Sequence, residues 1–241
     1  MAAAIALVLA IALAAPLTAR EDTDVDPIRL DDVPYQPHPL PESLRASFAE
    51  EHYGDQLQET AVGALVWSHF PVTVYFDGNA PETWQSQMMS VVEQWGEYLP
   101  LQQIEESERA NIVIWQRRPP PRRVGDDFRA AAARVSYELY WREQRLGHRF
   151  EILLSPTQGT EAAQAALRHE LGHALGIWGH SDRPTDVMYY SQVRRPPMIS
   201  ARDLATLRYV YEQPTRLGWP IRPDSAGWPT EDSFETVSKD T

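Results

Sequence analysis

The sequence predicts an α+β fold, in which a mixed sheet and a few helices share one hydrophobic core. Apolar and polar residues alternate over residues 72–76, which is typical of a half-buried strand. Residues 81–100 instead repeat apolar side chains at helical spacing, and several strand-like runs follow them. A strand, a helix and then several strands favour an α+β sheet over a regular strand–helix alternation.

The two ends of the chain are predicted to lie outside the folded domain, which we place at residues 61–215. Residues 1–19 carry no charge and precede an acidic run, a pattern that predicts a signal peptide or, alternatively, an uncleaved membrane anchor. Either segment predicts a secreted or periplasmic protein. Residues 20–60 form a Pro- and Asp-rich N-terminal segment. Its residues 21–43 lack periodicity, so we expect a linker or an extended segment there, and we expect order to begin near residues 43–54. Residues 216–241 are predicted to be a disordered tail.

Within the predicted domain, further strands follow the helix of residues 81–100. Apolar, β-branched and aromatic residues predict them, and Pro, Gly and Asp mark the turn-rich loop between the first two. The predicted strands are residues 110–116, 133–141 and 149–156, and the loop is residues 119–127.

Two more helices complete the predicted domain. One begins near Thr160, the expected N-cap residue, and ends before Gly176, which can adopt the left-handed conformation of a helix C-terminus. The other covers residues 200–213, where Ser200 and Asp203 have the spacing of a capping box.

Composition excludes several classes of function. The 241 residues include 34 acids and 22 basic residues, but no cysteine, so thiol catalysis and disulfides are excluded. Residues 21–60 alone carry eleven acids and two arginines, which leaves the middle of the chain nearly neutral. Nucleic-acid binders need a basic face on the folded domain, so we predict no nucleic-acid partner. Residues 117–149 hold nine arginines and four acids, for which we favour a solvated loop over a site for an acidic ligand.

The segment "HELGH", residues 169–173, carries the strongest chemical signal. Two histidines four apart on a helix lie one turn above each other, so His169 and His173 can reach a single zinc ion. Glu170 lies one step around the helix and can accept a proton from a water activated by the metal. These residues predict a zinc site for hydrolysis, although a chance occurrence on an amphipathic helix is the alternative for this motif alone.

The residues after the helix supply a third ligand. Gly176 can stop the helix and turn the chain, so that His180 folds back towards the metal. Asp182 is the alternative oxygen ligand nearby. The other histidines lack partners at ligand spacing and are predicted to be surface or satisfied core residues, so no second zinc site is assigned. They are His38, His52, His69 and His148.

The sequence "HELGHALGIWGH", followed by "SDRPTDVMYYS", resembles the metzincin zinc peptidases, and in particular bacterial matrixin-like (matrixin/adamalysin-type) proteins. The family pattern places its third histidine three residues after the glycine, where this chain has Gly179, so His180 implies a turn longer by one residue. The resemblance implies a metzincin fold, with a twisted mixed sheet and an active-site helix above a small lower lobe. Met188 would be the Met-turn residue of that lobe, and Tyr190 would stabilise the oxyanion.

The family resemblance also bears on latency and calcium. Matrixins use a propeptide cysteine for latency, which this chain lacks, and an Asp from residues 21–60 could take that role as in astacins; a plain linker is the simpler alternative. Calcium is possible but unsupported, because only His148 stands where His and Asp clusters would be needed.

We therefore predict an exported, monomeric zinc endopeptidase that acts on polypeptides. It would have no membrane contact unless residues 1–19 stay attached. Two alternatives stay open: a noncatalytic binding domain stabilised by zinc, and a zinc hydrolase of a non-peptide amide or ester.

Overall fold

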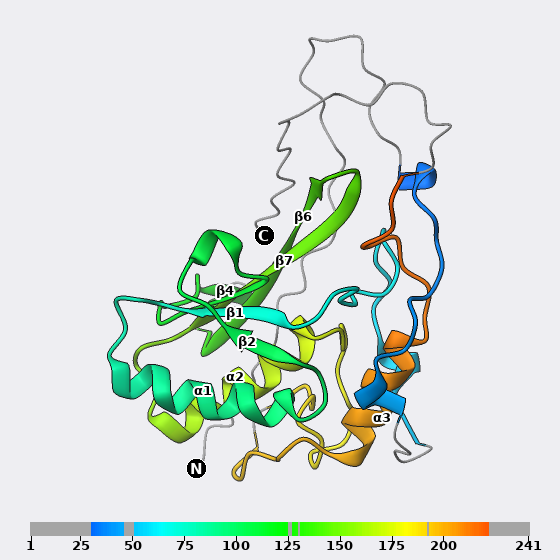
Figure 1. Cartoon of the computed structure of the whole chain (residues 1–241). Helices are drawn as coiled ribbons and strands as arrows, with labels where there is room; N and C mark the ends of the chain where they lie inside the picture. Colours follow the sequence, from blue (N-terminus) through cyan, green and yellow to red (C-terminus); the bar gives the residue numbers. More distant parts are fainter. Residues whose placement is uncertain (1–29, 46–50, 125–126, 130, 192, 222–241) are drawn as a thin grey trace.

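The structure is a computed structural model that describes residues 30–45, 51–124, 127–129, 131–191 and 193–221 (Figure 1). The segment predicted as a signal peptide lies outside these ranges, as do most of the predicted tail and residues 20–29 and 46–50 of the N-terminal segment. None of the helices within the described ranges is both long and apolar enough to cross a membrane.

A five-stranded sheet forms the centre of the molecule, with the strand order β2-β1-β3-β7-β6. The first four of these strands run parallel to their neighbours, whereas β6 is antiparallel to β7. The predicted mixed sheet is therefore confirmed. The strands are β1 (Val72–Phe76), β2 (Leu101–Gln103), β3 (Ile112–Trp115), β6 (Ala133–Arg142) and β7 (Arg145–Leu154).

The hairpin of β6 and β7 extends beyond the other strands (Figure 1). Its two central turn residues, Glu143 and Gln144, have φ angles of 50° and 59°, as in the tight turns that match strand twist. This turn explains why β7 begins at residue 145, four residues before the predicted strand. Near the turn, Gly218 N donates to Leu146 O at 2.8 Å, so the C-terminal segment lies along the outer part of β7.

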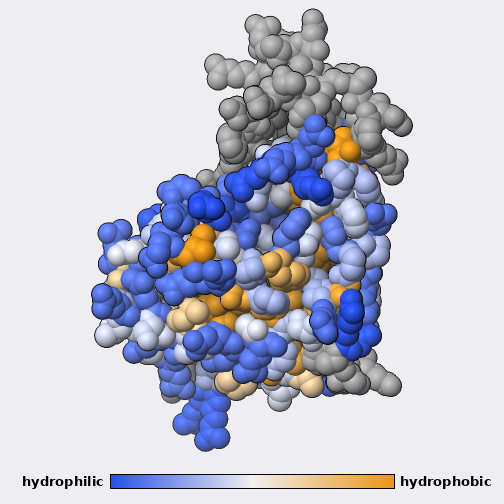
Figure 2. All heavy atoms as spheres, viewed as in Figure 1, coloured by the Kyte–Doolittle hydropathy of each residue, from blue (hydrophilic) through white to orange (hydrophobic). Residues whose placement is uncertain are grey.

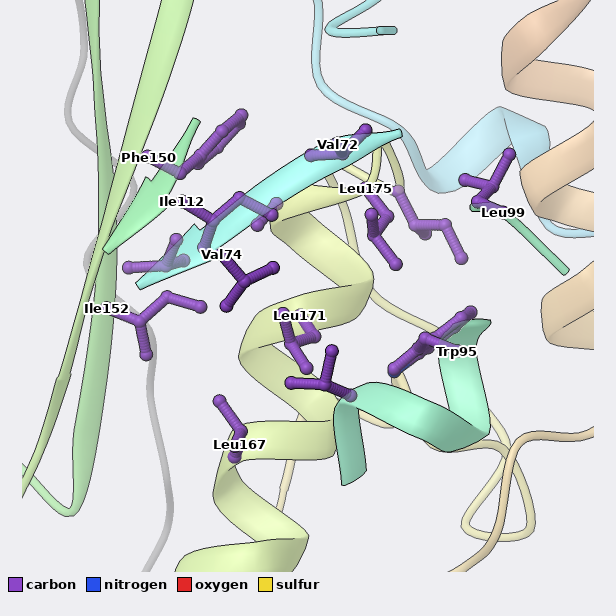
Figure 3. Packing of buried hydrophobic residues seen from close by; sticks show 14 of the residues in the cluster. Val72, Val74, Trp95, Leu99, Ile112, Phe150, Ile152, Leu167, Leu171 and Leu175 are labelled. Carbon is purple, nitrogen blue, oxygen red and sulfur yellow. The ribbon is translucent and has the colours of Figure 1, made fainter. Parts of the chain in front are cut away.

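Helices α1 (Glu82–Gly96) and α2 (Thr160–Ala174) pack together on one face of the sheet (Figure 1). Leu167 and Leu171 of α2 lie between the sheet and Trp95 of α1 in the core (Figure 3). The indole of Trp95 also donates a hydrogen bond to Arg168 O at 3.0 Å. Burying one face of α2 in this way leaves its other face for the histidines.

Helix α3 (Ala201–Tyr211) contacts the 3-10 helix at Gly54–Gln56 and carries the predicted capping box of Ser200 and Asp203, which is confirmed. Helix α2 begins one residue earlier than predicted, because Gly159 rather than Thr160 is the N-cap residue. The remaining elements are short and were not predicted, because three or four residues are too few to show periodicity. They are β2, the pair β4 (Arg122–Val124) and β5 (Asp127–Arg129), and 3-10 helices at Leu30–Asp32, Glu42–Arg45, Gly54–Gln56 and Ser107–Arg109.

Much of the described N-terminal segment packs against the folded body. Leu44 and Tyr53 are fully buried in the core, and Gln36 pairs with Thr215 near the end of the chain. This segment shows no periodicity in its sequence, because it is held by isolated bridges and short turns that present single apolar residues. Elsewhere the surface is mostly hydrophilic, with a band of hydrophobic residues across the face shown in Figure 2.

Candidate metal centre

Two histidines on α2 have one ring nitrogen fixed by the backbone. His169 Nδ1 lies 2.8 Å from Val187 O, and His173 Nδ1 lies 2.7 Å from Ile177 O. A carbonyl oxygen only accepts hydrogen bonds, so each Nδ1 carries the proton and donates it. Each neutral ring therefore presents a bare Nε2 with a free lone pair, as a metal ligand requires.

These two bare nitrogen atoms face each other. His169 Nε2 and His173 Nε2 are 3.2 Å apart, and neither has a proton to share when both Nδ1 atoms are protonated. Two ligand atoms on a tetrahedral zinc ion at roughly 2.0–2.1 Å would lie about 3.3–3.4 Å apart. The spacing of the two lone pairs therefore fits a cation between them better than any direct bond.

His180 completes the group. Its ring centroid lies 5.3 Å from that of His169 and 5.0 Å from that of His173. One possible ligand atom from each of the three residues lies within 4.8 Å of the others. Within the described ranges, these three histidines form the group of side chains that could bind a metal ion. Three histidines form a common protein ligand set for zinc. The structure thus brings together the three predicted ligands as a group that could bind a metal.

The longer turn places His180 through close backbone contacts. Gly176 has a φ of +128° and ends α2, as predicted. At Gly179, a Cβ atom would lie 2.4 Å from Gln56 O and 2.8 Å from Leu57 Cα, so only glycine fits there. Gln58 N also donates to Trp178 O at 2.8 Å. The N-terminal segment therefore holds the turn. The sequence did not predict this contact, because it joins residues far apart in the chain.

Glu170 is fully buried beside His169 in the sequence, and neither of its carboxyl oxygens has a hydrogen-bond partner within the described structure. Burial raises the pKa of this carboxyl to about 8, because the charged form loses its hydration. A nearby cation would have the opposite effect and favour the carboxylate. An orphaned buried acid at this position therefore fits a metal and its water better than a purely structural role.

The histidines are held in the neutral form that binds metals. Burial lowers the pKa of His169 and of His180 to about 4, and neighbouring His169 adds to the effect on His180. For His173, burial lowers the pKa well below its ordinary value, and the adjacent His169 and His180 lower it further. All three rings are thus electrically neutral at neutral pH, so the donor set fits zinc.

A hydrogen-bond network centred on Asp203 supports the position of His169. Asp203 on α3 accepts from Val187 N at 2.9 Å, and the carbonyl of Val187 in turn orients His169. Asp203 also accepts from the hydroxyl of Tyr53 at 2.6 Å and from Ser200 N at 2.8 Å. Burial raises the pKa of Asp203, and these hydrogen bonds oppose that change. The sequence predicted Asp203 only as a capping residue; its second contact could not be read from local spacing.

The other predicted site residues lie in different surroundings. Met188 is fully buried, and a Cβ at Gly172 of α2 would collide with its sulfur, while its role as a Met-turn residue stays a prediction. Tyr190 is 54% exposed and its ring lies against Tyr189, so its catalytic role also stays a prediction. Asp182 pairs instead with Arg202 at 3.0 Å and does not belong to the histidine group.

No protein-family model matches the sequence, and no curated protein is similar to it at a significant level. Among solved structures, the crystal structure of myroilysin matches with 11% sequence identity and a TM-score of 0.35. The match covers 79% of this chain and 99% of that chain. A likeness this low carries no argument about activity, which rests on the site residues themselves.

Proposed function

We propose that this protein is an exported zinc-dependent endopeptidase of the metzincin type. The observation that carries the proposal is the pair of bare Nε2 atoms of His169 and His173, 3.2 Å apart, together with the buried and unpartnered carboxyl of Glu170 on the same helix. Export is supported by the uncharged residues 1–19, and the metzincin type by the motif that continues to His180.

The three histidines would hold the metal through ring nitrogens, and the backbone acceptors of His169 and His173 would keep these rings in place. When bound, zinc would polarise the scissile carbonyl and lower the pKa of a water in the site. Glu170 would accept a proton from the attacking water and pass it to the leaving amine. The carboxyl oxygens of Glu170 would be free to accept the proton and to donate it again, because no side chain in the described structure forms a hydrogen bond with them.

The two alternative functions differ in what they require of this site. A noncatalytic zinc domain has a closed site with four protein ligands. Here the group within the described ranges has three members, and Asp182 is paired elsewhere, which favours an open position for water. A hydrolase of a small amide or ester would use the same residues, so substrate comparison separates it: casein digestion supports the peptidase, and hydrolysis of small esters alone contradicts it.

Replacement of the proposed base tests the mechanism. We expect Glu170→Gln to keep stoichiometric zinc but to lose casein hydrolysis by at least about 100-fold, because the metal stays while proton transfer does not. Zinc content and initial rates are measured on the same preparation. Wild-type turnover in a zinc-loaded Glu170→Gln protein would contradict the assigned role of Glu170.

A further inference from the structure

A cavity of about 270 Å³ lies beside the turn end of the β6–β7 hairpin, and none of the three clustered histidines lines it. Trp67 forms part of its wall, and its indole donates to Ala174 O at the end of α2 at 2.9 Å. Tyr140 and Gly147 of the hairpin face each other in the wall, where a Cβ at position 147 would collide with the tyrosine ring. The walls of the cavity are therefore closely packed side chains, and the proposed peptidase activity does not use this cavity.

The charged side chains around this cavity are mainly positive. Arg142 and Arg145 line it, together with His69, whereas Glu143 is the acid in the lining. Arg142 lies over the ring of Tyr140 at 5.3 Å, and Arg145 donates to Gly218 O at 2.7 Å. Neither guanidinium forms an ion pair with a described residue. In a protein with a net charge of −12, this local excess of positive charge is an exception.

His148 supplies a buried polar atom without a partner in the cavity wall. It is 3% exposed, lines the cavity and stacks on Trp67 with ring centroids 3.9 Å apart. Its Nε2 makes no hydrogen bond within the described structure, so the sequence-based expectation of a satisfied core histidine is wrong. A buried nitrogen without a partner is costly, and a ligand in the cavity would satisfy it.

His38 lies close to the same group of positive side chains. Burial lowers the pKa of His38, and the nearby His69 and Arg145 lower it further. The ring nitrogen of His38 contacts Leu217 O at 2.7 Å, so an acid is not its partner. An anion bound nearby would relieve this repulsion.

We propose that this cavity is a binding site for a small oxyanion ligand that carries a carboxylate or phosphate group. Arg142 and Arg145 would bind the charged oxygens, for which the guanidinium fork is well matched, and His148 would donate its Nε2 proton from the buried wall. The volume is slightly below that of pockets for drug-sized molecules, so it suits a small ligand or a single acidic group. The excess of arginine over residues 117–149 thus has a partial explanation in ligand binding.

The test measures anion binding to the full zinc-loaded chain, whatever its peptidase activity. Inorganic phosphate and succinate are titrated separately at constant ionic strength, and the imidazole signals of His148 are followed by nuclear magnetic resonance. We expect saturable shifts with at least one anion, and the one that binds more tightly identifies phosphate or carboxylate as the recognised group. No saturable shift with either anion would overturn the proposal.

Three variants locate the bound anion. Arg142→Gln removes one cation, and His148→Phe keeps a ring on Trp67 but removes the nitrogen, so each should weaken binding by roughly tenfold or more. Isothermal titration calorimetry gives the affinity of the phenylalanine variant. Arg118→Gln is the matched control, because this exposed arginine lies outside the cavity, and it should bind like wild type. Equal loss in the control, or unchanged binding in Arg142→Gln or His148→Phe, would refute the site.

Discussion

The two helical histidines and the third histidine reach the candidate metal centre by different means. His169 and His173 stand on one buried helix, and each has a backbone oxygen that fixes its ring within 2.8 Å. His180 lies in a turn and is only partly buried. Its position depends on Gly179, which packs against the backbone of Gln56 and Leu57. Helix geometry thus organises one half of the site locally, whereas distant chain segments organise the other half.

This difference predicts which substitutions act locally and which act at a distance. The two helical histidines, as proposed ligands, depend mainly on their own side chains and on the backbone oxygens that orient them. The third ligand can also be lost when a segment more than a hundred residues away is displaced, because Gln58 N binds Trp178 O. The predictions below test this contrast.

The largest effect is expected on removal of the third ligand. His180→Ala should lower zinc affinity by more than 100-fold, since even loss of a residue that only supports a ligand typically costs 10–100-fold. Asp182→Ala should leave affinity within about twofold of wild type, because Asp182 is paired with Arg202. Zinc content after dialysis against graded chelator concentrations measures both. The opposite ranking would make Asp182 the third ligand.

The next effect comes from a change that touches no ligand. Gly179→Ala places a Cβ against Gln56 O and Leu57 Cα, so the turn or the N-terminal segment must move, and zinc affinity should fall roughly 10–100-fold. Gly96→Ala is the matched control, because a Cβ there meets nothing within 4 Å. Chelator competition compares the two proteins. Wild-type affinity in Gly179→Ala would show that the third ligand does not depend on this contact.

The same contrast explains how far the sequence could predict the molecule. The placement of His169 and His173 on one helix, the helix end at Gly176 and the capping box of Ser200 follow from spacing within a few residues, and these predictions are confirmed. The packing of Tyr53 and the contact of Gly179 with Gln56 join residues far apart in the chain. Local periodicity carries no information on such pairs. The motif shows Gly179 where the family pattern has its third histidine. The contact that requires a glycine there lies in the N-terminal segment.

A smaller effect is expected at the support below His169. Both carboxylate oxygens of Asp203 accept hydrogen bonds, including those from Val187 N and Ser200 N. In Asp203→Asn the amide would turn a donor towards at least one of these donors, so the free energy of unfolding should fall by about 1–3 kcal/mol. Because Val187 O orients His169, zinc affinity should fall as well. Denaturant unfolding and chelator competition test this against Asp55→Asn, an exposed change in the N-terminal segment that should have no effect.

The smallest effect is expected where the N-terminal segment meets the same carboxylate. Tyr53→Phe removes the hydroxyl that donates to Asp203 Oδ1 at 2.6 Å but keeps the buried ring. Asp203 retains its backbone donors, so the free energy of unfolding should fall by only about 1 kcal/mol and zinc affinity should change less than twofold. Tyr35→Phe, at a side chain 53% exposed, is the control for loss of a hydroxyl. A large loss of zinc affinity in Tyr53→Phe would mean that the N-terminal segment also organises the helical half, because His169 would then depend on a residue that lies 116 positions away through Asp203 and Val187.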